Sequence, residues 1–427
     1  MSSIKSIAII GLGYVGLPIA LLASKKGFNV IGIDTDIKKI KSLASNKSYI
    51  GDVADDEIIH TKASFTTDAT KVSEVDAVII CVQTPVSAEK IPDLGPVRGA
   101  VSAIAPHIKK ETLVVVESTI NPGVCDEVVI PLLEKLSGKK VGIDVYLAHC
   151  PERINPGDPK WNVSNINRVV GANSKLELDM AVELYKKIID AEIKPMGTIK
   201  EAEAVKIVEN SFRNINIAFV NELAMSFHKL GINLENVIDG AATKPFAFIP
   251  HHPGCGVGGH CIPVDPYYLI EYAHNHGFEH EFLRLASNIN ESMPRFTVDL
   301  LIEALNEVGL PLKDTKVTLL GMSYKANVGD GRESPAHVIR DLLVEAETNL
   351  TIYDPYTPED STTNSLNEAL AGATAVVIAT GHDEFKNITP SLLKKNGNLV
   401  LIDGRNILRS QKEAFKNNSI IYTGIGI

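Results

Sequence analysis

Short apolar runs alternate with amphipathic stretches along the first 200 positions. The runs that predict strands are Ser6–Ile10, Asn29–Ile33, Ala77–Val82, Leu113–Val116 and Val145–Ala148. Strands that alternate with helices form a parallel, doubly wound sheet. Ligands of such sheets bind beyond the carboxyl ends of the strands, and every run after the first is followed by polar residues. We therefore expect a site where the strands end.

The pattern changes at Thr198, where a longer helical stretch begins. Thr198 and Glu201 have the spacing of a capping box, and the stretch continues to about Leu230 without Pro or Gly. A loop rich in Gly, Pro and His follows from Thr243 to Pro266, and helical texture then returns to about Gly309. One long helix in mid-chain is typical of a bridge between two domains.

From about Pro311 the strand–helix order of the first region begins again. The run before Gly321 corresponds to the run before Gly11, and the run before Asp354 corresponds to the run before Asp34. We predict an α/β protein in which two doubly wound, Rossmann-like parallel-sheet domains are joined by a central helical domain with one long helix. The predicted domains are residues 1–197, 198–310 and 311–427.

Composition narrows the functional classes. The 427 residues carry 42 Lys and Arg against 52 Asp and Glu, and this net charge of −10 without a basic run argues against nucleic-acid and membrane-surface roles. Five Cys without a CxxC pair indicate a reducing, cytoplasmic location. The apolar run Ile7–Ala23 contains glycines and a proline and is too long for the core of a signal peptide. It fits a strand, turn and helix better than a membrane anchor.

The first turn has the spacing of a dinucleotide-binding motif. Gly11, Gly13 and Gly16 follow a strand and open a helix, and Asp34 ends the next strand. In this motif the glycines allow a tight turn, a close approach to the pyrophosphate and close helix packing, and the acid binds the ribose hydroxyls. A carboxylate there repels a 2′-phosphate, which favours NAD over NADP. The alternative is a structural turn in a domain that binds something else.

The third region lacks these glycines and carries cations at its strand ends instead. Lys325, Arg332 and Arg405 could form a phosphate or nucleotide clamp. The alternative is ordinary solvated surface charge.

On the long helix, Glu203, Lys206 and Asn210 share one face. They could form an interhelical hydrogen-bond network or face a site.

The loop Gly254–Cys261 is the most specific signal. Four glycines in eight residues make a backbone that can approach a ligand closely, and Asp265 follows four residues after the terminal thiol. A nucleophilic Cys261 is the favoured interpretation. A zinc site would draw on His251, His252, Cys255, His260 and Cys261, but the spacing is not that of a zinc knuckle, so we expect no metal. NAD together with a thiol favours oxidation of an aldehyde to a carboxylate through a thiohemiacetal and a thioester.

Four motifs then resemble a known family. They are Gly256–Pro266, Ile10–Pro18, Cys150–Arg153, and Lys325 with Gly329–Pro335. Together they resemble the UDP-glucose/UDP-mannose dehydrogenase family over essentially the whole chain. His260 before Cys261, Ile-Pro-Val-Asp-Pro after it, and the loop Thr243–Phe248 are similar to the UDP-N-acetylglucosamine/UDP-N-acetylmannosamine 6-dehydrogenase branch.

The resemblance implies a role for each matching residue. Cys261 would be the thiolate, Lys206 the base or the cation at the C6 oxygen, and Asn210 a donor to that oxygen. Asp265 and Thr119 would position water, and Glu152 would be the acid or base of the second step. The implied cofactor contacts are Gly11, Gly13, Tyr14, Val15, Gly16, Asp34, Thr84, Thr119 and Arg332. The implied substrate contacts are Glu152, Arg153, Lys206, Asn210, Phe248, Gly258, Lys325 and Arg405.

The function expected from this resemblance is the four-electron oxidation of C6 of a UDP-N-acetylhexosamine, with two NADH formed per sugar, for surface polysaccharide or glycan synthesis. The resemblance also implies a homodimer built through the central helices. The alternatives are a UDP-glucose 6-dehydrogenase and a catalytically inactive nucleotide-sugar-binding protein. Cys255 stands where the family usually has Pro, and its proximity in sequence to Cys261 suggests a regulatory disulfide as a hypothesis.

Overall fold

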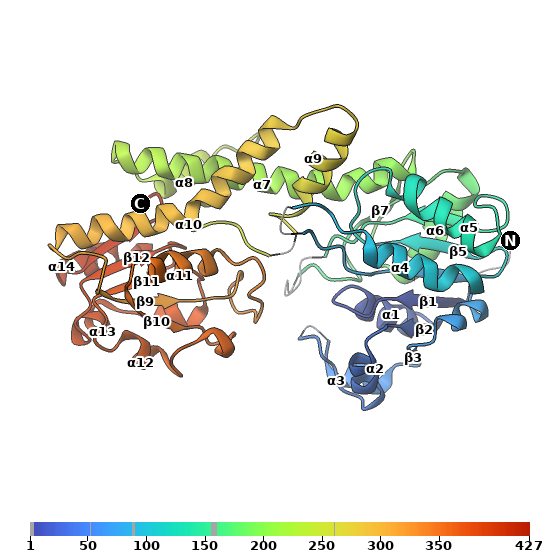
Figure 1. Ribbon diagram of the computed structural model, residues 1–427, viewed down its shortest axis with the longest axis horizontal. Helices are drawn as coiled ribbons and strands as arrows, with labels where there is room; N and C mark the ends of the chain where they lie inside the picture. The colour runs from blue at the N-terminus through green and yellow to red at the C-terminus, as the bar shows by residue number, and fades with distance from the viewer. Residues whose placement is uncertain (1–3, 52, 88–89, 155–159, 260) are drawn as a thin grey trace. The chain divides into compact units, whose positions relative to one another are not determined.

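The computed structural model describes residues 4–51, 53–87, 90–154, 160–259 and 261–427 (Figure 1). The chain divides into two compact units. The N-terminal unit comprises residues 1–209 and 267–278, and the C-terminal unit comprises residues 210–266 and 279–427.

An eight-stranded sheet organises the N-terminal unit, in the order β3-β2-β1-β4-β5-β6-β7-β8. Its strands are β1 Ser6–Ile10, β2 Asn29–Ile33, β3 Ser64–Thr66, β4 Ala77–Ile80, β5 Leu113–Val116, β6 Tyr146–His149, β7 Arg168–Ala172 and β8 Ile193–Pro195. The helices are α1 Gly16–Lys25, α2 Ile37–Ala44, α3 Asp55–His60, α4 Gly95–Ile104, α5 Ile130–Ser137 and α6 Lys175–Ile188. Pairing is parallel except between β6 and β7, an antiparallel step that the sequence pattern did not predict.

Both faces of this sheet are buried. Ile7 and Ile9 of β1 enter one hydrophobic cluster, whereas Ala8 and Ile10 enter another on the opposite face. Alternate side chains of a strand point to opposite faces, so helices must cover both sides of these continuous apolar runs. The predicted doubly wound arrangement is confirmed.

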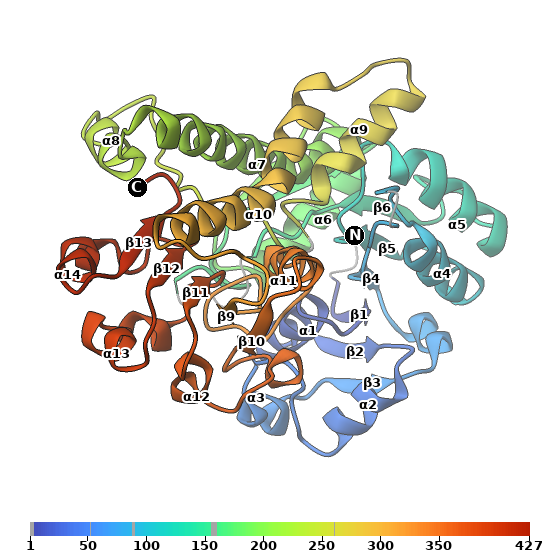
Figure 2. The same ribbon diagram turned by 60° about the vertical axis from the view of Figure 1, so that its left-hand side comes forward.

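The C-terminal unit contains a five-stranded parallel sheet in the order β10-β9-β11-β12-β13. Its strands are β9 Lys316–Leu320, β10 Asn349–Tyr353, β11 Ala375–Ile378, β12 Val400–Asp403 and β13 Ile421–Gly424. Its helices are α8 Leu234–Ala241, α10 Glu281–Glu307, α11 Pro335–Glu345, α12 Leu366–Leu370, α13 Pro390–Lys395 and α14 Lys412–Asn417. Residues of α10 and α11 pack on one face of the sheet and residues of α12, α13 and α14 on the other (Figures 1 and 2).

Shorter helical turns complete the described elements. They are the 3-10 turns Ala69–Glu74, Ala105–His107, Pro358–Asp360, Asp383–Asn387 and Arg409–Gln411, and the π-helical turn Cys125–Val129.

The long helix is α7, Ile199–Leu230, and it contributes residues to both units. The Thr198 Oγ1 accepts the Glu201 N–H at 3.1 Å, and the Glu201 carboxylate accepts the Thr198 N–H at 3.0 Å. This reciprocal pair confirms the predicted capping box. The helix α9, Asp265–Asn275, begins after the short turn that follows the glycine-rich loop. Among the described residues, none of the helices combines the length and apolar character needed to cross a bilayer.

Candidate active site

The glycine turn after β1 has the shape needed to approach a dinucleotide. A Cβ on Gly16 would lie 1.9 Å from the Gly11 carbonyl oxygen, so α1 packs directly on the turn. Gly11 adopts a φ of +91°, and its Cβ would lie 2.8 Å from the Cys81 carbonyl oxygen. A Cβ on Gly13, in contrast, would meet no atom within 4 Å. Protein atoms therefore occupy the space beside Gly11 and Gly16, whereas the space beside Gly13 is open. This arrangement fits a bound NAD at Gly13.

The remaining residues of the turn lie at the start of α1. Tyr14 is exposed, and Val15 is half-buried at the N-cap of the helix without a side-chain cap. Backbone N–H groups at a helix start attract anions, so the start of α1 is suited to the cofactor phosphates.

Asp34 follows β2 and is already engaged by the protein. Its Oδ2 accepts the Leu12 N–H and the Lys39 Nζ, each at 2.8 Å, and its Oδ1 accepts the Asp36 N–H at 2.9 Å. Burial raises the pKa of this carboxyl, but the bonds from Lys39 and the two N–H groups outweigh it and hold the pKa below its usual value. A carboxylate has about four acceptor sites, so one remains for a ribose hydroxyl. Accepting from both hydroxyls requires Lys39 to move away.

Two further predicted residues lie at the carboxyl ends of β5 and β6. Thr119 is half-buried just beyond β5, and Glu152 is almost fully buried just beyond β6. The Glu152 Oε1 accepts the Ile154 N–H, which turns the carboxylate back onto its own loop. The adjacent ends of these strands therefore bring both residues to one edge of the sheet.

Arg153 ties this loop to α7. Its guanidinium forms a two-pronged pair with Glu209 and donates to the Asn167 carbonyl oxygen at 3.1 Å. Such paired bonds fix a guanidinium in one orientation. We expect Arg153 to hold the Glu152 loop against the helix, and contact with substrate would require part of this pairing to be exchanged.

Glu203 joins α7 to the segment that follows β5. The side chain is buried, and its carboxylate accepts the N–H groups of Gly123 and Cys125 at 2.5 and 2.8 Å. Burial raises the pKa of Glu203 to about 7 despite these two bonds. Lys206, one turn later, is 8% exposed and is thus enclosed in protein. Two alternatives were considered for this helical face, and for Glu203 the structure shows a role in hydrogen bonding within the protein.

Glu203 makes the stability of the protein depend on pH. Its folded pKa of about 7 lies above the ordinary glutamate value of 4.5, so the folded state holds the proton more tightly than the unfolded state does. The free energy of unfolding should therefore fall as pH rises from about 5 to 7, by up to about 1.4 kcal/mol per pH unit from this group. Urea unfolding of wild type and Glu203→Gln across this range measures the effect, and the advantage of wild type should shrink as pH rises.

The control for loss of charge is Glu201→Gln, in the exposed first turn of the same helix. A constant difference between wild type and Glu203→Gln from pH 5 to 7 would contradict the prediction.

Thr84 lies beyond β4, and its carbonyl oxygen accepts the Tyr268 hydroxyl of α9. A second hydroxyl of α9, that of Tyr272, donates to Glu127 at 2.6 Å. Tyrosine hydroxyl groups therefore hold α9 within the N-terminal unit, and these long-range contacts could not be predicted from the sequence.

The predicted nucleophile lies in the turn that precedes α9. The Cys261 carbonyl oxygen accepts the N–H groups of Val264 and Asp265 at 3.1 and 2.7 Å, and Cys261 is partly exposed. Asp265 is 3% exposed, and its Oδ2 accepts the Asn210 Nδ2. The fold thus brings together Asn210 and Asp265, 55 residues apart, beside the turn that begins at Cys261. His260 lies outside the described residues.

The glycines before Cys261 permit contact with a second segment, residues 324–335. A Cβ on Gly258 would lie 2.7 Å from the Tyr324 Cβ and 2.8 Å from the Glu333 carbonyl oxygen. Gly259 adopts a φ of +85°, and its N–H donates to the Arg332 carbonyl oxygen at 3.2 Å. The predicted substrate contact Gly258 therefore lies packed against the segment that carries Lys325 and Arg332.

The three predicted cations have different surroundings. Arg332 forms a two-pronged ion pair with Asp330, with contacts of 2.6 to 3.1 Å. The Arg405 Nε donates to the Ala379 carbonyl oxygen at 2.9 Å, and its Nη1 lies 3.5 Å from the Gly256 carbonyl oxygen. Lys325 is half-buried. The half-buried Arg405 supports the glycine-rich loop. The side chain of Arg332, in contrast, is 45% exposed and pairs with Asp330 at the surface.

Phe248 is half-buried and packs against the hydrophobic core of the C-terminal unit.

Cys255 lies inside this unit. The side chain is fully buried, its Sγ donates to the Ala379 carbonyl oxygen at 3.2 Å, and burial raises the pKa of the thiol. Neither Cys255 nor Cys261 is part of a disulfide in the structure. A buried protonated thiol is a poor nucleophile, so a disulfide between them would require the loop to open.

A buried cluster of polar side chains near the ends of β5 and β6 was not predicted from the sequence. Glu117 accepts the Tyr185 hydroxyl and lies 3.7 Å from the Arg168 guanidinium, and all three side chains are buried. Burial raises the pKa of Glu117 to about 7, although Arg168 and Tyr185 oppose the rise. The only sequence signal was the position of Glu117 at a strand end, because Arg168 and Tyr185 lie more than 50 residues away.

Comparison with known proteins matches three successive segments to one family. Residues 5–189, 200–292 and 318–410 match the NAD binding, central and UDP binding domains of the UDP-glucose/GDP-mannose dehydrogenase family. The second nucleotide sugar in the family's name is GDP-mannose, which corrects the UDP-mannose of the sequence-based resemblance.

Similar proteins match over nearly the whole chain. The UDP-N-acetyl-D-mannosamine dehydrogenase of Pyrococcus horikoshii is 36% identical over 98% of this chain and 99% of its own. The UDP-N-acetyl-D-glucosamine 6-dehydrogenase of Pseudomonas aeruginosa is 34% identical over 95% of this chain and 98% of its own. A solved structure of the UDP-D-ManNAc dehydrogenase of Pyrococcus horikoshii superposes with a TM-score of 0.90 at 35% identity, covering 99% of each chain. The chain therefore belongs to the UDP-glucose/GDP-mannose dehydrogenase family of NAD-dependent nucleotide-sugar 6-dehydrogenases.

Proposed function

We propose that this enzyme oxidises C6 of a UDP-N-acetylhexosamine, UDP-N-acetylglucosamine or UDP-N-acetylmannosamine, to the uronic acid with two NADH formed per sugar, for surface polysaccharide or glycan synthesis. The observation that carries the proposal is the contact between Asn210 and Asp265 beside the Cys261 turn. It places an amide, a carboxylate and a partly exposed thiol around one turn. The full-length relatives named for the two acetamido sugars support the choice of substrate.

Each proposed step uses a group of this chain. NAD supplies a hydride acceptor at each of the two oxidations. In the first, Lys206 takes the proton of the C6 hydroxyl, and the aldehyde forms. The Cys261 thiolate then adds to C6, and Asn210 donates to the resulting oxyanion. Loss of the second hydride leaves a thioester at Cys261. Water positioned by Asp265 and Thr119 attacks the thioester, with Glu152 accepting its proton, and releases the carboxylate and the thiol.

The proposed division of labour follows the predicted domains. Residues 1–197 would bind NAD, residues 198–310 would carry the thiol loop and the dimer contact, and residues 311–427 would bind the UDP-sugar. The proposed NAD contacts are those of the glycine turn, Asp34, Thr84, Thr119 and Arg332. The proposed sugar-nucleotide contacts are Glu152, Arg153, Lys206, Asn210, Phe248, Gly258, Lys325 and Arg405.

The test of the function is the amount of NADH formed per sugar at completion. UDP-N-acetylglucosamine, UDP-N-acetylmannosamine, UDP-N-acetylgalactosamine and UDP-glucose are compared under limiting sugar. Two NADH from one acetamido sugar and little from UDP-glucose are expected. One NADH per sugar would mean that Cys261 does not carry out a second oxidation. Two NADH from UDP-glucose alone would favour the UDP-glucose 6-dehydrogenase alternative. No NADH from any of the four sugars would favour a binding protein.

We also propose a homodimer formed through the central helices. Phe212 and Phe219 of α7 are about half exposed, and Phe282 and Leu285 of α10 are 64% and 54% exposed. Large apolar side chains grouped on helix surfaces are typical of covered interfaces. Light scattering coupled to size-exclusion chromatography tests this, since Phe282→Glu should shift the mass from dimer to monomer. A monomeric wild type would reject the proposal.

A further inference from the structure

The C-terminal unit repeats the turn of the NAD-binding motif. The Gly321 N–H donates to the Tyr353 carbonyl oxygen at 2.9 Å with a φ of +89°, as the Gly11 N–H donates to the Ile33 carbonyl oxygen at 2.8 Å. The next residue then donates its N–H to the acid that ends the neighbouring strand. Met322 donates to the Asp354 Oδ2 at 2.6 Å, just as Leu12 donates to Asp34 at 2.8 Å. The two acids thus occupy equivalent places.

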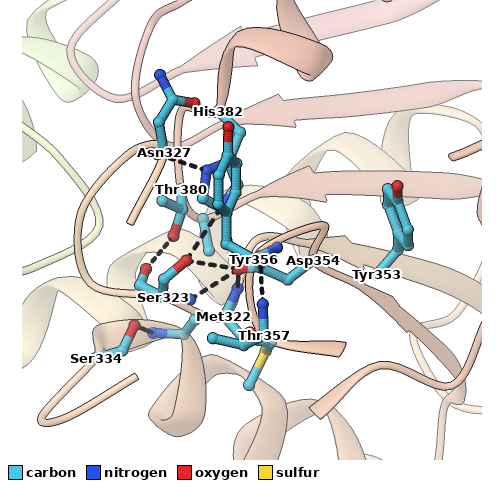
Figure 3. A network of polar contacts seen from close by, with 12 residues as sticks. Met322, Ser323, Asn327, Ser334, Tyr353, Asp354, Tyr356, Thr357, Thr380 and His382 are labelled. Carbon is cyan, nitrogen blue, oxygen red and sulfur yellow. Dashed lines mark hydrogen bonds and ion pairs between the residues drawn. The ribbon is translucent and has the colours of Figure 1, made fainter. Parts of the chain in front are cut away.

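The surroundings of the two acids differ. Asp354 is 1% exposed, and its Oδ2 also accepts the Ser323 N–H and hydroxyl, at 2.9 and 2.7 Å (Figure 3). The other oxygen, Oδ1, accepts the N–H groups of Tyr356 and Thr357 at 2.7 and 3.1 Å. Although burial raises the pKa of Asp354, the bonds from His382 and Ser323 hold it well below its usual value. Its oxygens are therefore occupied by protein donors, and a ribose hydroxyl finds no acceptor there.

His382 completes this network from the end of β11. The ring is fully buried, and its Nε2 lies 3.0 Å from the Asp354 Oδ2 and 3.1 Å from the Ser323 Oγ. Its Nδ1 accepts the Asn327 N–H at 2.9 Å (Figure 3). A ring nitrogen that accepts an N–H carries no proton, so the hydrogen of the neutral ring lies on Nε2 and points to Asp354. The ring of Tyr356 stacks on His382, with ring centroids 4.9 Å apart.

The same contacts fix the far end of the turn. Asn327 has a φ of +61°, and its side-chain amide exchanges hydrogen bonds with Asp383, at 2.7 Å to the carboxylate and 3.1 Å from the backbone N–H. Residues 322–327 are thus held at one end by Asp354 and at the other by His382 and Asp383. Lys325 lies between the two fixed points.

From this arrangement we infer that Asp354 and His382 are positioning residues, which hold Lys325 in place to bind the diphosphate of the nucleotide sugar. The inference rests on the proposed role of Lys325 in substrate binding. A loop that is already ordered before binding loses less conformational entropy when the ligand arrives. The acid that would bind a ribose in a dinucleotide site instead orders a phosphate-binding loop in this unit.

Variants of His382 can distinguish the hydrogen bond at Nδ1 from the hydrogen bond at Nε2. An asparagine amide oxygen can accept near the position of Nδ1, and a glutamine amide nitrogen can donate near the position of Nε2. His382→Ala should raise the KM for the UDP-sugar and the Kd for UDP about tenfold or more, with kcat within about threefold and the KM for NAD unchanged. His382→Asn and His382→Gln should each restore part of the loss. Thr318→Val is the control, since it removes another buried hydrogen bond of the same unit, from Thr318 of β9 to the Ala369 carbonyl oxygen of α12.

A double-mutant cycle tests whether His382 acts through Lys325. If it does, Lys325→Ala combined with His382→Ala should bind UDP no more weakly than Lys325→Ala alone. Independent multiplication of the two effects, or a wild-type Kd in His382→Ala, would overturn the inference while leaving the proposed function intact. A wild-type Kd in Lys325→Ala would overturn both the inference and the proposed role of Lys325. A raised KM for the UDP-sugar in Thr318→Val would show that the effect of His382→Ala comes from general destabilisation and would overturn the inference.

Discussion

Replacing Cys261 by alanine is expected to stop the conversion of the sugar to its uronic acid, with the rate of uronic-acid formation lowered at least about 10³-fold and the second NADH per sugar lost. Without the thiol no covalent aldehyde adduct forms, so the second hydride has no thiohemiacetal to leave. Cys261 is partly exposed in a turn beside Asp265 and Asn210, and the substitution removes little buried surface. The variant should therefore keep the thermal unfolding midpoint and the UDP affinity of wild type.

The matched control is Cys255→Ser. Its Sγ lies in the protein interior against the Ala379 carbonyl oxygen, and a serine hydroxyl can make the same bond. This variant should lose some stability and keep most of its turnover. Full turnover in Cys261→Ala would exclude the thioester route and favour a simple two-electron dehydrogenase.

The second large effect is expected for Gly16→Ala. The new Cβ would lie 1.9 Å from the Gly11 carbonyl oxygen and 3.2 Å from the Cys81 Cβ, so either α1 or the turn must move. Gly16 itself is buried in the N-terminal unit, where such overpacking costs about 3 kcal/mol. We expect a lower free energy of unfolding in urea and an increase of about 100-fold or more in the KM for NAD, because the turn is displaced.

Gly13→Ala separates the approach of the cofactor from folding. A Cβ at this position meets no protein atom within 4 Å, so stability should change by less than about 1 kcal/mol. The KM for NAD should nevertheless rise, because the methyl group occupies space that the pyrophosphate needs. A wild-type KM for NAD in Gly13→Ala would show that the turn does not contact the cofactor. Wild-type stability in Gly16→Ala would contradict the packing argument.

The sequence predicted the elements whose signals are local. The strand runs, the glycine turn and the capping box of Thr198 and Glu201 each depend on residues close together in the chain. Even the correspondence of Asp34 and Asp354 could be recognised from the order of the elements. The antiparallel pairing of β6 with β7 could not be predicted, because the direction of pairing depends on the path of the intervening loop.

Candidate chemistry could be assigned to residue types, but not the partners of those residues. Glu203 shares its helical face with Lys206, as predicted, yet it binds backbone groups about 80 residues away. Arg405 was expected at the substrate, and the structure shows its guanidinium supporting the glycine-rich loop.

The sequence by itself determined the fold class, the NAD-binding turn and the thiol loop, because spacing along the chain fixes backbone geometry over a few residues. Only the tertiary structure decided which acids and cations are occupied by the protein. Asp34 and Asp354 follow equivalent strands, but Asp34 retains an acceptor site whereas Asp354 is enclosed by Ser323 and His382. Hydrogen bonds of this kind depend on distant segments being packed together, and burial then excludes the water that would otherwise compete for them.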